Sequence, residues 1–314
     1  HKLNVDWVSP AYVEMREWSN APGVGHGCYL YKPRDFFPGR RSPLIIVQYR
    51  PSLCLRGGVG DEYPTHLFSA QGFMVLCFNQ PENYDIFAQS KDAYDAWKRE
   101  WTDNIRQRQI LSSLETIIDR LDKQGLIDPA RVGITGLSAG SEAVQFAVIN
   151  SNAFAAAAFS SPAFEPILNY TLSEKLREGL LKPAGFGRPG TDQGYNWPAM
   201  SLSMNADRIT TPLLIQASDH EYISALQSLV GLREAGNAID MYVFPDEYHI
   251  KWSPKHRFYI YQRNIDWFNF WLRGVKDNDP AKALQYKHWD GLRRASSPAA
   301  SPKIPITGSE MPGN

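Results

Sequence analysis

A serine between two glycines is the clearest chemical signal in the sequence. Gly136-Leu137-Ser138-Ala139-Gly140 fits the Gly-x-Ser-x-Gly pattern of a nucleophile elbow. In such an elbow a sharp turn exposes the serine hydroxyl, and small flanking residues let the strand and the helix approach closely. An apolar run at 132–135 precedes the motif and a helix-like run follows it, which is the required strand-turn-helix setting. The pattern predicts Ser138 as the nucleophile of an acyl transfer.

A serine hydroxyl is a weak nucleophile until a base accepts its proton, so the chain must supply partners. In folds with this elbow the partners follow in the order serine, carboxylate, histidine, each after a later strand. Asp219 directly follows an expected strand at 213–217, and His249 follows another at 240–244. We predict His249 as the general base and Asp219 as the carboxylate that orients it.

Other residues fit these two roles less well. The remaining candidate bases lie on the acid's own loop, inside the last expected helix, or before the elbow: His220, His256, His26 and His66. Asp246 is a second candidate acid, but it lies too close in sequence to His249 to orient it easily.

The tetrahedral intermediate of acyl transfer needs hydrogen-bond donors that point at its oxyanion. One predicted donor is the backbone N–H of Ala139, at the start of the helix after the elbow. The second is expected from the end of the strand at 44–49, where the sequence has Tyr49. Taken alone, Tyr49 is equally well explained as a core aromatic residue that ends a strand.

The rest of the pattern predicts elements that position these residues. Short apolar runs alternate with helical segments, which indicates a mostly parallel sheet with helices on both faces. The expected strands are 44–49, 73–78, 132–135, 153–159, 213–217 and 240–244, and the expected helices are 65–71, 102–123, 140–150, 223–235 and 254–272. Residues 12–18 and 27–31 alternate in polarity around a turn, which predicts an N-terminal antiparallel hairpin. The predicted fold is the α/β-hydrolase fold.

Composition limits the domain organisation and the function. The chain has 314 residues, and we predict one hydrolase domain over 1–288 and a Ser/Pro/Ala-rich tail over 289–314. The segment 183–198, rich in glycine and proline, predicts a loop or lid. Lysine plus arginine (33) equal aspartate plus glutamate (33), which argues against nucleic acid or an anionic membrane as partner.

Cysteines and the first residue give further expectations. Cys28, Cys54 and Cys77 lack paired spacing, so we expect free or buried thiols rather than a disulfide or a metal site. No apolar stretch is long enough to span a bilayer. Because the chain begins at His1, we expect a processed protein or a fragment, and the compartment stays open.

Several segments together resemble the catalytic domain of the prolyl oligopeptidase family of serine peptidases. They are 30–33, the strand that ends at Tyr49, the elbow, 211–215 before Asp219, and 244–249 before a helix that ends in 267–272. The resemblance implies that Tyr49 donates its phenol to the oxyanion and that no cofactor is needed.

Within that family the sequence is most similar to the lasso peptide isopeptidases of proteobacteria. The stretches that carry this likeness are 48–50, 55–64 and 246–257. Ordinary members have a His-Gly or glycine-rich oxyanion loop and a Gly-His-Gly at the catalytic histidine, and this chain has neither. The resemblance implies a soluble bacterial enzyme, cytoplasmic or periplasmic, that hydrolyses the isopeptide bond between the N-terminal amine of a lasso peptide and an Asp or Glu side chain.

One departure from the family concerns substrate contact. Members carry an N-terminal β-propeller, and this sequence shows no blade repeats, so we expect the propeller elsewhere in a longer protein or selectivity from another source. In the second case Arg56 is a candidate to bind a carboxylate and Glu62 an amine, although the pairing of these two residues with each other is the simpler and favoured interpretation. Trp197 is expected to line the pocket, and its alternative is a buried anchor of the lid.

Three other functions stay open at this point. A general oligopeptidase or aminopeptidase of the same family would prefer linear peptides, and a carboxylesterase would use the same three residues. An inactive member that serves as a binding module is disfavoured, because all three residue types of the triad are present at the expected places.

Overall fold

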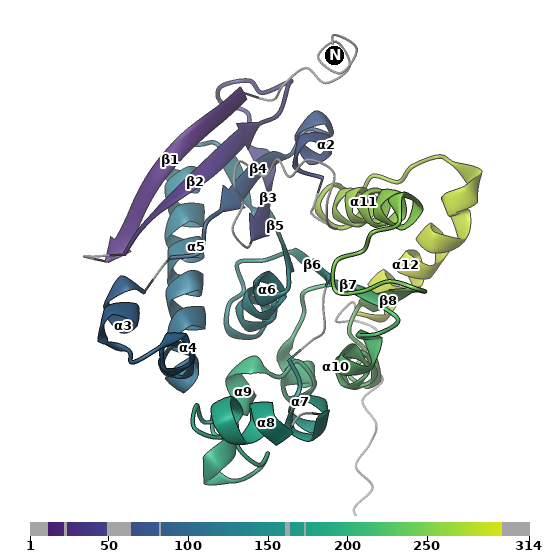
Figure 1. Cartoon of the computed structure of the whole chain (residues 1–314). Coiled ribbons are helices and arrows are strands. Elements are labelled where there is room, and N and C mark those ends of the chain that lie inside the picture. Colours follow the sequence, from purple (N-terminus) through teal and green to yellow (C-terminus); the bar gives the residue numbers. More distant parts are fainter. Residues whose placement is uncertain are drawn as a thin grey trace, which may run out of the picture.

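Eight strands form a single sheet in the computed structural model, which describes residues 12–21, 24–48, 64–81, 83–160, 164–172 and 174–296. The strand order is β1-β2-β4-β3-β5-β6-β7-β8 (Figure 1). β1 pairs antiparallel with β2 and β2 antiparallel with β4, whereas every pair from β4 to β8 is parallel. The predicted fold is confirmed: a mostly parallel sheet with an N-terminal antiparallel hairpin.

The central strands are buried on both faces. The strands are β1 (Tyr12–Ala21), β2 (Val24–Lys32), β3 (Ser42–Gln48), β4 (Met74–Phe78), β5 (Ile127–Leu137), β6 (Ala156–Ser160), β7 (Leu213–Ser218) and β8 (Ile239–Phe244). Every residue of β3, β4, β6 and β7 is buried. Continuous burial explains why these strands appear in the sequence as short apolar runs rather than as alternating patterns.

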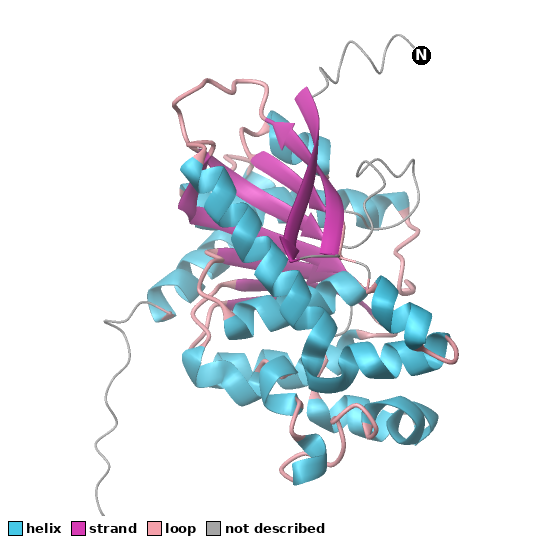
Figure 2. Cartoon of the chain, turned by 90° about the vertical axis from the view of Figure 1, so that its left-hand side faces the viewer, coloured by secondary structure: helices cyan, strands magenta, loops and turns pink. Residues whose placement is uncertain are grey.

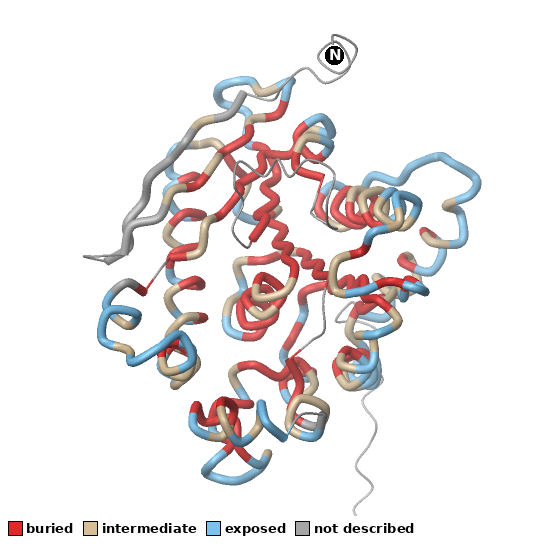
Figure 3. Tube along the Cα trace, viewed as in Figure 1, coloured by how far each residue is buried: buried red, intermediate tan, exposed pale blue. Residues whose placement is uncertain are grey.

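Helices cover the two faces of the sheet (Figures 1 and 2). One face carries α5 (Ile105–Lys123), α6 (Ala139–Asn150) and α10 (Tyr222–Glu234), and the other carries α2 (Thr65–Ala70), α11 (Pro254–Phe268) and α12 (Ala283–Ala295). Alternate residues of β3 enter the two resulting cores, Ile46 on the α5 side and Ile45 on the α11 side. The buried positions accordingly run through the middle of the molecule (Figure 3).

Shorter elements complete the molecule. They are α3 (Tyr84–Gln89), α4 (Ala93–Trp101), η1 (Thr102–Asn104), α7 (Pro166–Leu172), α8 (Glu174–Leu176), η2 (Arg177–Leu181), η3 (Asp192–Gly194), α9 (Trp197–Met200), η4 (Ser203–Arg208), η5 (Asn269–Arg273) and η6 (Pro280–Lys282). α9 packs on α6, and α7 packs on α10. The predicted loop at 183–198 therefore contains helical turns. No helix among the described residues is long and apolar enough to cross a membrane.

The folded domain extends past its predicted end at residue 288. Helix α12 continues to Ala295 because Trp289 is fully buried, with its ring 5.1 Å from that of Trp267. The indole N–H of Trp289 also donates to the carboxylate of Asp240 on β8, at 2.8 Å. The predicted boundary is thus corrected, and of the predicted tail only residues 297–314 lie outside the described residues.

The cysteines differ from the expectation in part. Cys28 is a free, buried thiol, and burial raises its pKa to about 12. Cys77, on β4, is disulfide-bonded, so the prediction of free thiols is wrong for this residue. Spacing along the chain shows only which cysteines are close in sequence, whereas a disulfide requires closeness in space.

Candidate active site

Ser138 occupies the sharp turn between β5 and α6. Its backbone angles are φ 58° and ψ −124°, a conformation that costs an L-residue free energy and that recurs at functional sites. The surrounding sheet holds the turn in place, because β5 is hydrogen-bonded to β3 on one side and to β6 on the other. Ser138 keeps some exposure to solvent at the carboxyl edge of the parallel strands. The strand-turn-helix setting predicted for the elbow is present.

Gly136 allows the close approach that this turn requires. A Cβ at position 136 would lie 2.4 Å from the carbonyl oxygen of Gly140, far inside van der Waals contact. We therefore expect Gly136→Ala to destabilise the fold by about 3 kcal/mol and to displace Ser138, because the clash is with backbone that cannot move aside. Chemical denaturation and the rate of labelling by a fluorophosphonate measure the two effects.

A second glycine provides the matched control for that substitution. A Cβ at Gly291, in α12, meets nothing within 4 Å, so Gly291→Ala is expected to stabilise the helix by about 0.5 to 1 kcal/mol and to leave labelling unchanged. If the two variants had equal stability and equal labelling rates, the assigned role of Gly136 would be contradicted.

His249 lies in the loop between β8 and α11 and contacts a carboxylate. Its Nδ1 is 2.7 Å from Oε1 of Glu221, at the start of α10. Burial acts to raise the pKa of Glu221, but the hydrogen bond and charge of His249, the charge of Lys251 and the hydrogen bond of Ser218 together hold that pKa below its ordinary value. Glu221 therefore stays ionised and is placed to stabilise an imidazolium at His249.

Asp219 has a different place from the predicted one. Its carboxylate accepts the backbone N–H of Asp246 at 2.8 Å and that of Glu247 at 3.3 Å, and these hydrogen bonds hold its pKa below the ordinary value. Asp219 thus binds the backbone of the loop that carries His249. The predicted contact between Asp219 and His249 is corrected: a glutamate two residues further on makes the contact.

A second carboxylate braces the same loop from inside. Glu247 is buried and accepts the backbone N–H of Trp252 at 2.6 Å and that of Ser253 at 2.9 Å. Its Oε1 also lies 2.8 Å from Nδ1 of His256, in the first turn of α11. His249 therefore lies in a loop whose backbone is fixed by two carboxylates, and no pattern in the sequence indicated this role for Glu247.

The backbone of the first turn of α6 supports the predicted oxyanion donor. The N–H groups of Ser141 and Glu142 bond to the carbonyl of Ser138, at 2.8 and 3.3 Å. The N–H of Ala139, the first residue of the helix, has no partner four residues back and lies at the positive end of the helix dipole. Tyr49, the other predicted donor, lies outside the described residues, as do Arg56 and Glu62.

Trp197 belongs to the hydrophobic core. It is fully buried, stacks on Phe164 with ring centroids 5.2 Å apart, and donates its indole N–H to the carbonyl of Gly187 at 2.8 Å. The predicted substrate contact is therefore wrong, and the alternative of a buried anchor is correct. The anchor fixes the segment at 183–198 against α6 and α4 through Phe186 and Trp101.

Four polar side chains follow one another from the first turn of α6 to the end of β3. Glu142, in the first turn of α6, faces Arg106 of α5, and Arg106 donates to Gln80 at 2.6 Å. Gln80 lies 3.5 Å from Gln48, the buried residue that ends β3. Burial raises the pKa of Glu142 from 4.5 to about 7, although the charge of Arg106 opposes the shift.

This shift predicts a pH-dependent stability. A carboxyl group whose pKa is raised by folding binds its proton more tightly in the folded state, so stability falls as the pH rises from about 4.5 to about 7. We expect Glu142→Gln to stabilise the chain by about 2 kcal/mol at pH 8 and to have little effect at pH 4.5. Urea unfolding at the two pH values measures the difference in stability between Glu142→Gln and wild type. An equal difference at both pH values would contradict the raised pKa of Glu142.

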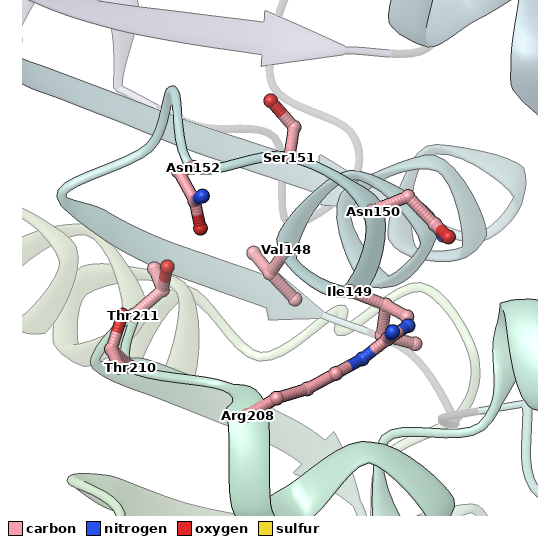
Figure 4. Close-up of a pocket in the computed structure, with 8 residues that line it drawn as sticks. All are labelled: Val148, Ile149, Asn150, Ser151, Asn152, Arg208, Thr210 and Thr211. Atoms are coloured by element: carbon pink, nitrogen blue, oxygen red, sulfur yellow. The ribbon is translucent and has the colours of Figure 1, made fainter.

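The pocket in Figure 4 is remote from Ser138. It has a volume of about 400 Å³ and is lined by Val148, Ile149, Asn150, Ser151, Asn152, Arg208, Thr210 and Thr211. These residues surround the carboxyl end of α6, whereas Ser138 precedes its amino end. Since the helix has 12 residues, the two ends are about 18 Å apart. The pocket therefore does not contribute to the site around the elbow.

Comparison with known proteins identifies the relatives of this chain. The chain is 42% identical over 299 residues to lasso peptide isopeptidase AtxE2 of Asticcacaulis excentricus, a match that covers 92% of this chain and 42% of that protein. The solved structure of AtxE2 isopeptidase without ligand superposes with a TM-score of 0.85 and 39% identity, over 92% of this chain and 44% of that one. A structure of a serine-to-alanine variant of AtxE2 with Astexin3-dC4 bound gives a TM-score of 0.84 and 36% identity, over 93% and 45% of the two chains.

More distant structures share the fold. Acylaminoacyl peptidase of Pyrococcus horikoshii has a TM-score of 0.67 at 17% identity, over 90% of this chain and 45% of that one. The chain thus spans less than half the length of the relatives it matches. Residues 65–275, which hold the elbow, Glu221 and His249, match the prolyl oligopeptidase family. The chain belongs to that family.

Proposed function

We propose that this chain is the catalytic part of a serine isopeptidase that opens the ring of a lasso peptide. The observation that carries the proposal is the hydrogen bond between His249 and Glu221, at the same sheet edge as the strained Ser138. The 42% identity with a lasso peptide isopeptidase supports the choice of substrate class. The proposed bond is the amide between the N-terminal amine of the peptide and the side chain of an Asp or Glu.

The proposed reaction is acyl transfer in two steps. His249 takes the proton of Ser138, whose oxygen attacks the side-chain carbonyl carbon of the ring-closing residue. The N–H of Ala139 and the phenol of Tyr49 are the proposed donors to the oxyanion. His249 then protonates the leaving amine. Glu221 stabilises the imidazolium that exists between these two proton transfers. Water, deprotonated by His249, releases the acyl group and restores Ser138.

This chemistry has a distinctive mass balance. Because the acyl group and the leaving amine belong to one peptide chain, ring opening releases no fragment. The acyl-enzyme has the mass of the enzyme plus the whole peptide, and the final product is one water heavier than the substrate. A protease that cuts between two residues of a linear peptide produces two shorter pieces instead.

Substrate contacts and the rest of the protein complete the proposal. Arg56 and Glu62 are proposed to contact charged groups of the peptide. Since the chain spans 42% of the length of AtxE2, an N-terminal β-propeller of the same protein is a proposed partner of this domain. We place no nucleic acid or membrane among the partners, because the sequence has no net charge.

Mass spectrometry after incubation with three peptides of one sequence tests the proposal. The peptides are a threaded lasso, its unthreaded branched form, and the linear form, each with wild type and with Ser138→Ala. We expect the threaded form to gain one water at the isopeptide bond with wild type alone. If only the linear peptide is cleaved, the function is that of a general peptidase, and if only a simple ester reacts, it is that of an esterase.

A further inference from the structure

A lysine lies buried in the loop that carries His249, two residues further along the chain. Lys251 has no exposed surface, although a buried ammonium ion is costly unless polar groups surround it. Its Nζ donates to the hydroxyl of Ser160 at 2.9 Å and approaches the backbone carbonyl of His249 at 3.5 Å. The acyl-transfer chemistry described above assigns no role to this side chain.

The contact with Ser160 connects the loop to the centre of the sheet. Ser160 ends β6 and lies in register with Leu137, the residue immediately before Ser138. The hydroxyl of Ser160 in turn donates to the carbonyl of Gln216 on β7, at 3.0 Å. Lys251 therefore joins the loop of the base to the strand next to the nucleophile.

The charge of Lys251 also acts on the carboxylate that contacts His249. It is one of the groups that hold the pKa of Glu221 below its ordinary value. A positive charge near an imidazole disfavours the imidazolium, and the general base must be neutral before it can accept the proton of a serine. The ammonium thus favours the ionised form of Glu221, the carboxylate that contacts the imidazole.

We propose that Lys251 is a positioning residue for acyl transfer: its ammonium ties the His249 loop to Ser160 at the end of β6 and so sets the imidazole against Ser138. The inference rests on the proposed function, since it assumes that His249 activates Ser138. It adds a fourth side chain, one that touches neither substrate nor the reacting atoms, to the triad. Proton transfer depends on sub-ångström placement, so a loosened loop lowers the rate strongly.

The test separates positioning from mere support of the fold. The variants are Lys251→Met, which removes the charge at similar length, Lys251→Arg, which keeps it, and Ser160→Ala, which removes one acceptor. Lys255→Met is the matched control, because Lys255 is exposed four residues further on. The measured quantity is the rate constant for labelling of Ser138 by a fluorophosphonate between pH 5 and pH 9, with circular dichroism to confirm folding.

The interpretation of that pH profile depends on the charged groups around the imidazole. On the elements that pack around His249, the charged and titratable groups of the described residues are Asp219, His220 and Glu221 from the loop after β7, Asp246, Glu247 and Lys251 from the loop of His249 itself, and His256 from α11. All of them except Lys251 are retained in the variants. A displaced acid limb in Lys251→Met is therefore due to the lost ammonium.

We expect Lys251→Met to label about 100-fold more slowly than wild type at the optimal pH, with its acid limb moved to higher pH. Lys251→Arg is expected to keep the position of the acid limb, and Ser160→Ala to lose about tenfold in rate without moving it. The proposal is wrong if the labelling rate constant of Lys251→Met equals that of Lys255→Met. It is also wrong if a folded Lys251→Met is labelled more slowly than wild type by the same factor at every pH. A wild-type chain that is not labelled at all overturns the proposed function, and the inference with it.

Discussion

Ser138→Ala is expected to lower the rate of amide hydrolysis by about 10⁵ to 10⁶ and to abolish labelling by a fluorophosphonate. The triad works as a unit, so loss of the nucleophile alone removes nearly all of its contribution. Alanine keeps a Cβ and the same backbone strain, so the fold and its stability are expected to stay close to those of wild type. Product formation is followed by liquid chromatography of the peptide.

Ser141 offers a matched control for this substitution. It lies one turn further along α6, is buried, and donates its hydroxyl to the carbonyl of Gly136 at 3.2 Å. Ser141→Ala removes the same atom from the same helix and is expected to cost about 1 kcal/mol of stability with little loss of labelling. A Ser138→Ala variant that still forms a covalent adduct would exclude Ser138 as the nucleophile.

Glu221→Gln is expected to lower kcat/KM by about 10³ to 10⁴, whereas Asp219→Asn should lower it by only about tenfold. Glutamine keeps the size of the side chain but no longer stabilises the imidazolium or fixes the tautomer of His249. Asparagine at 219 still offers one oxygen to the backbone N–H groups of Asp246 and Glu247, so the loop of the base loses only part of its support.

Glu221→Gln and Asp219→Asn serve as controls for each other, because each removes one negative charge from the same loop. Measurement of kcat/KM across pH for both variants decides between the two carboxylates. If Asp219→Asn proves the more damaging variant, the contact seen between Glu221 and His249 does not exist during catalysis, and the acid predicted from the sequence is restored.

The geometry of the elbow and the place of His249 beside a carboxylate could be predicted from the sequence. The sharp turn at Ser138 requires small neighbours, and only a glycine fits at 136, so the pentapeptide itself reveals the backbone geometry. His249 could be found because the chain order of the fold leaves few candidates after the strand at 240–244. The parallel strands were visible because burial on both faces makes them uniformly apolar.

The choice of the acid could not be made from the sequence. Asp219 and Glu221 lie two residues apart in one loop, and only the fold decides which carboxylate reaches the imidazole and which reaches backbone N–H groups. The burial of Trp197 and Trp289 in the core could not be predicted from the sequence for the same reason. A tryptophan in a segment rich in glycine, or near a polar tail, is placed by packing against residues distant in sequence, such as Phe164 and Trp267.

Isolation of the acyl-enzyme is the most direct test that Ser138 opens the ring of a lasso peptide. The chain is mixed with a threaded lasso peptide, quenched in acid within milliseconds, digested with trypsin, and examined by tandem mass spectrometry. We expect an adduct with the mass of the intact peptide on the tryptic fragment that starts after Arg131, located on Ser138 and linked through the side-chain carbonyl of the ring-closing Asp or Glu. An adduct on another residue, or one linked through a backbone carbonyl with part of the peptide lost, would contradict this expectation.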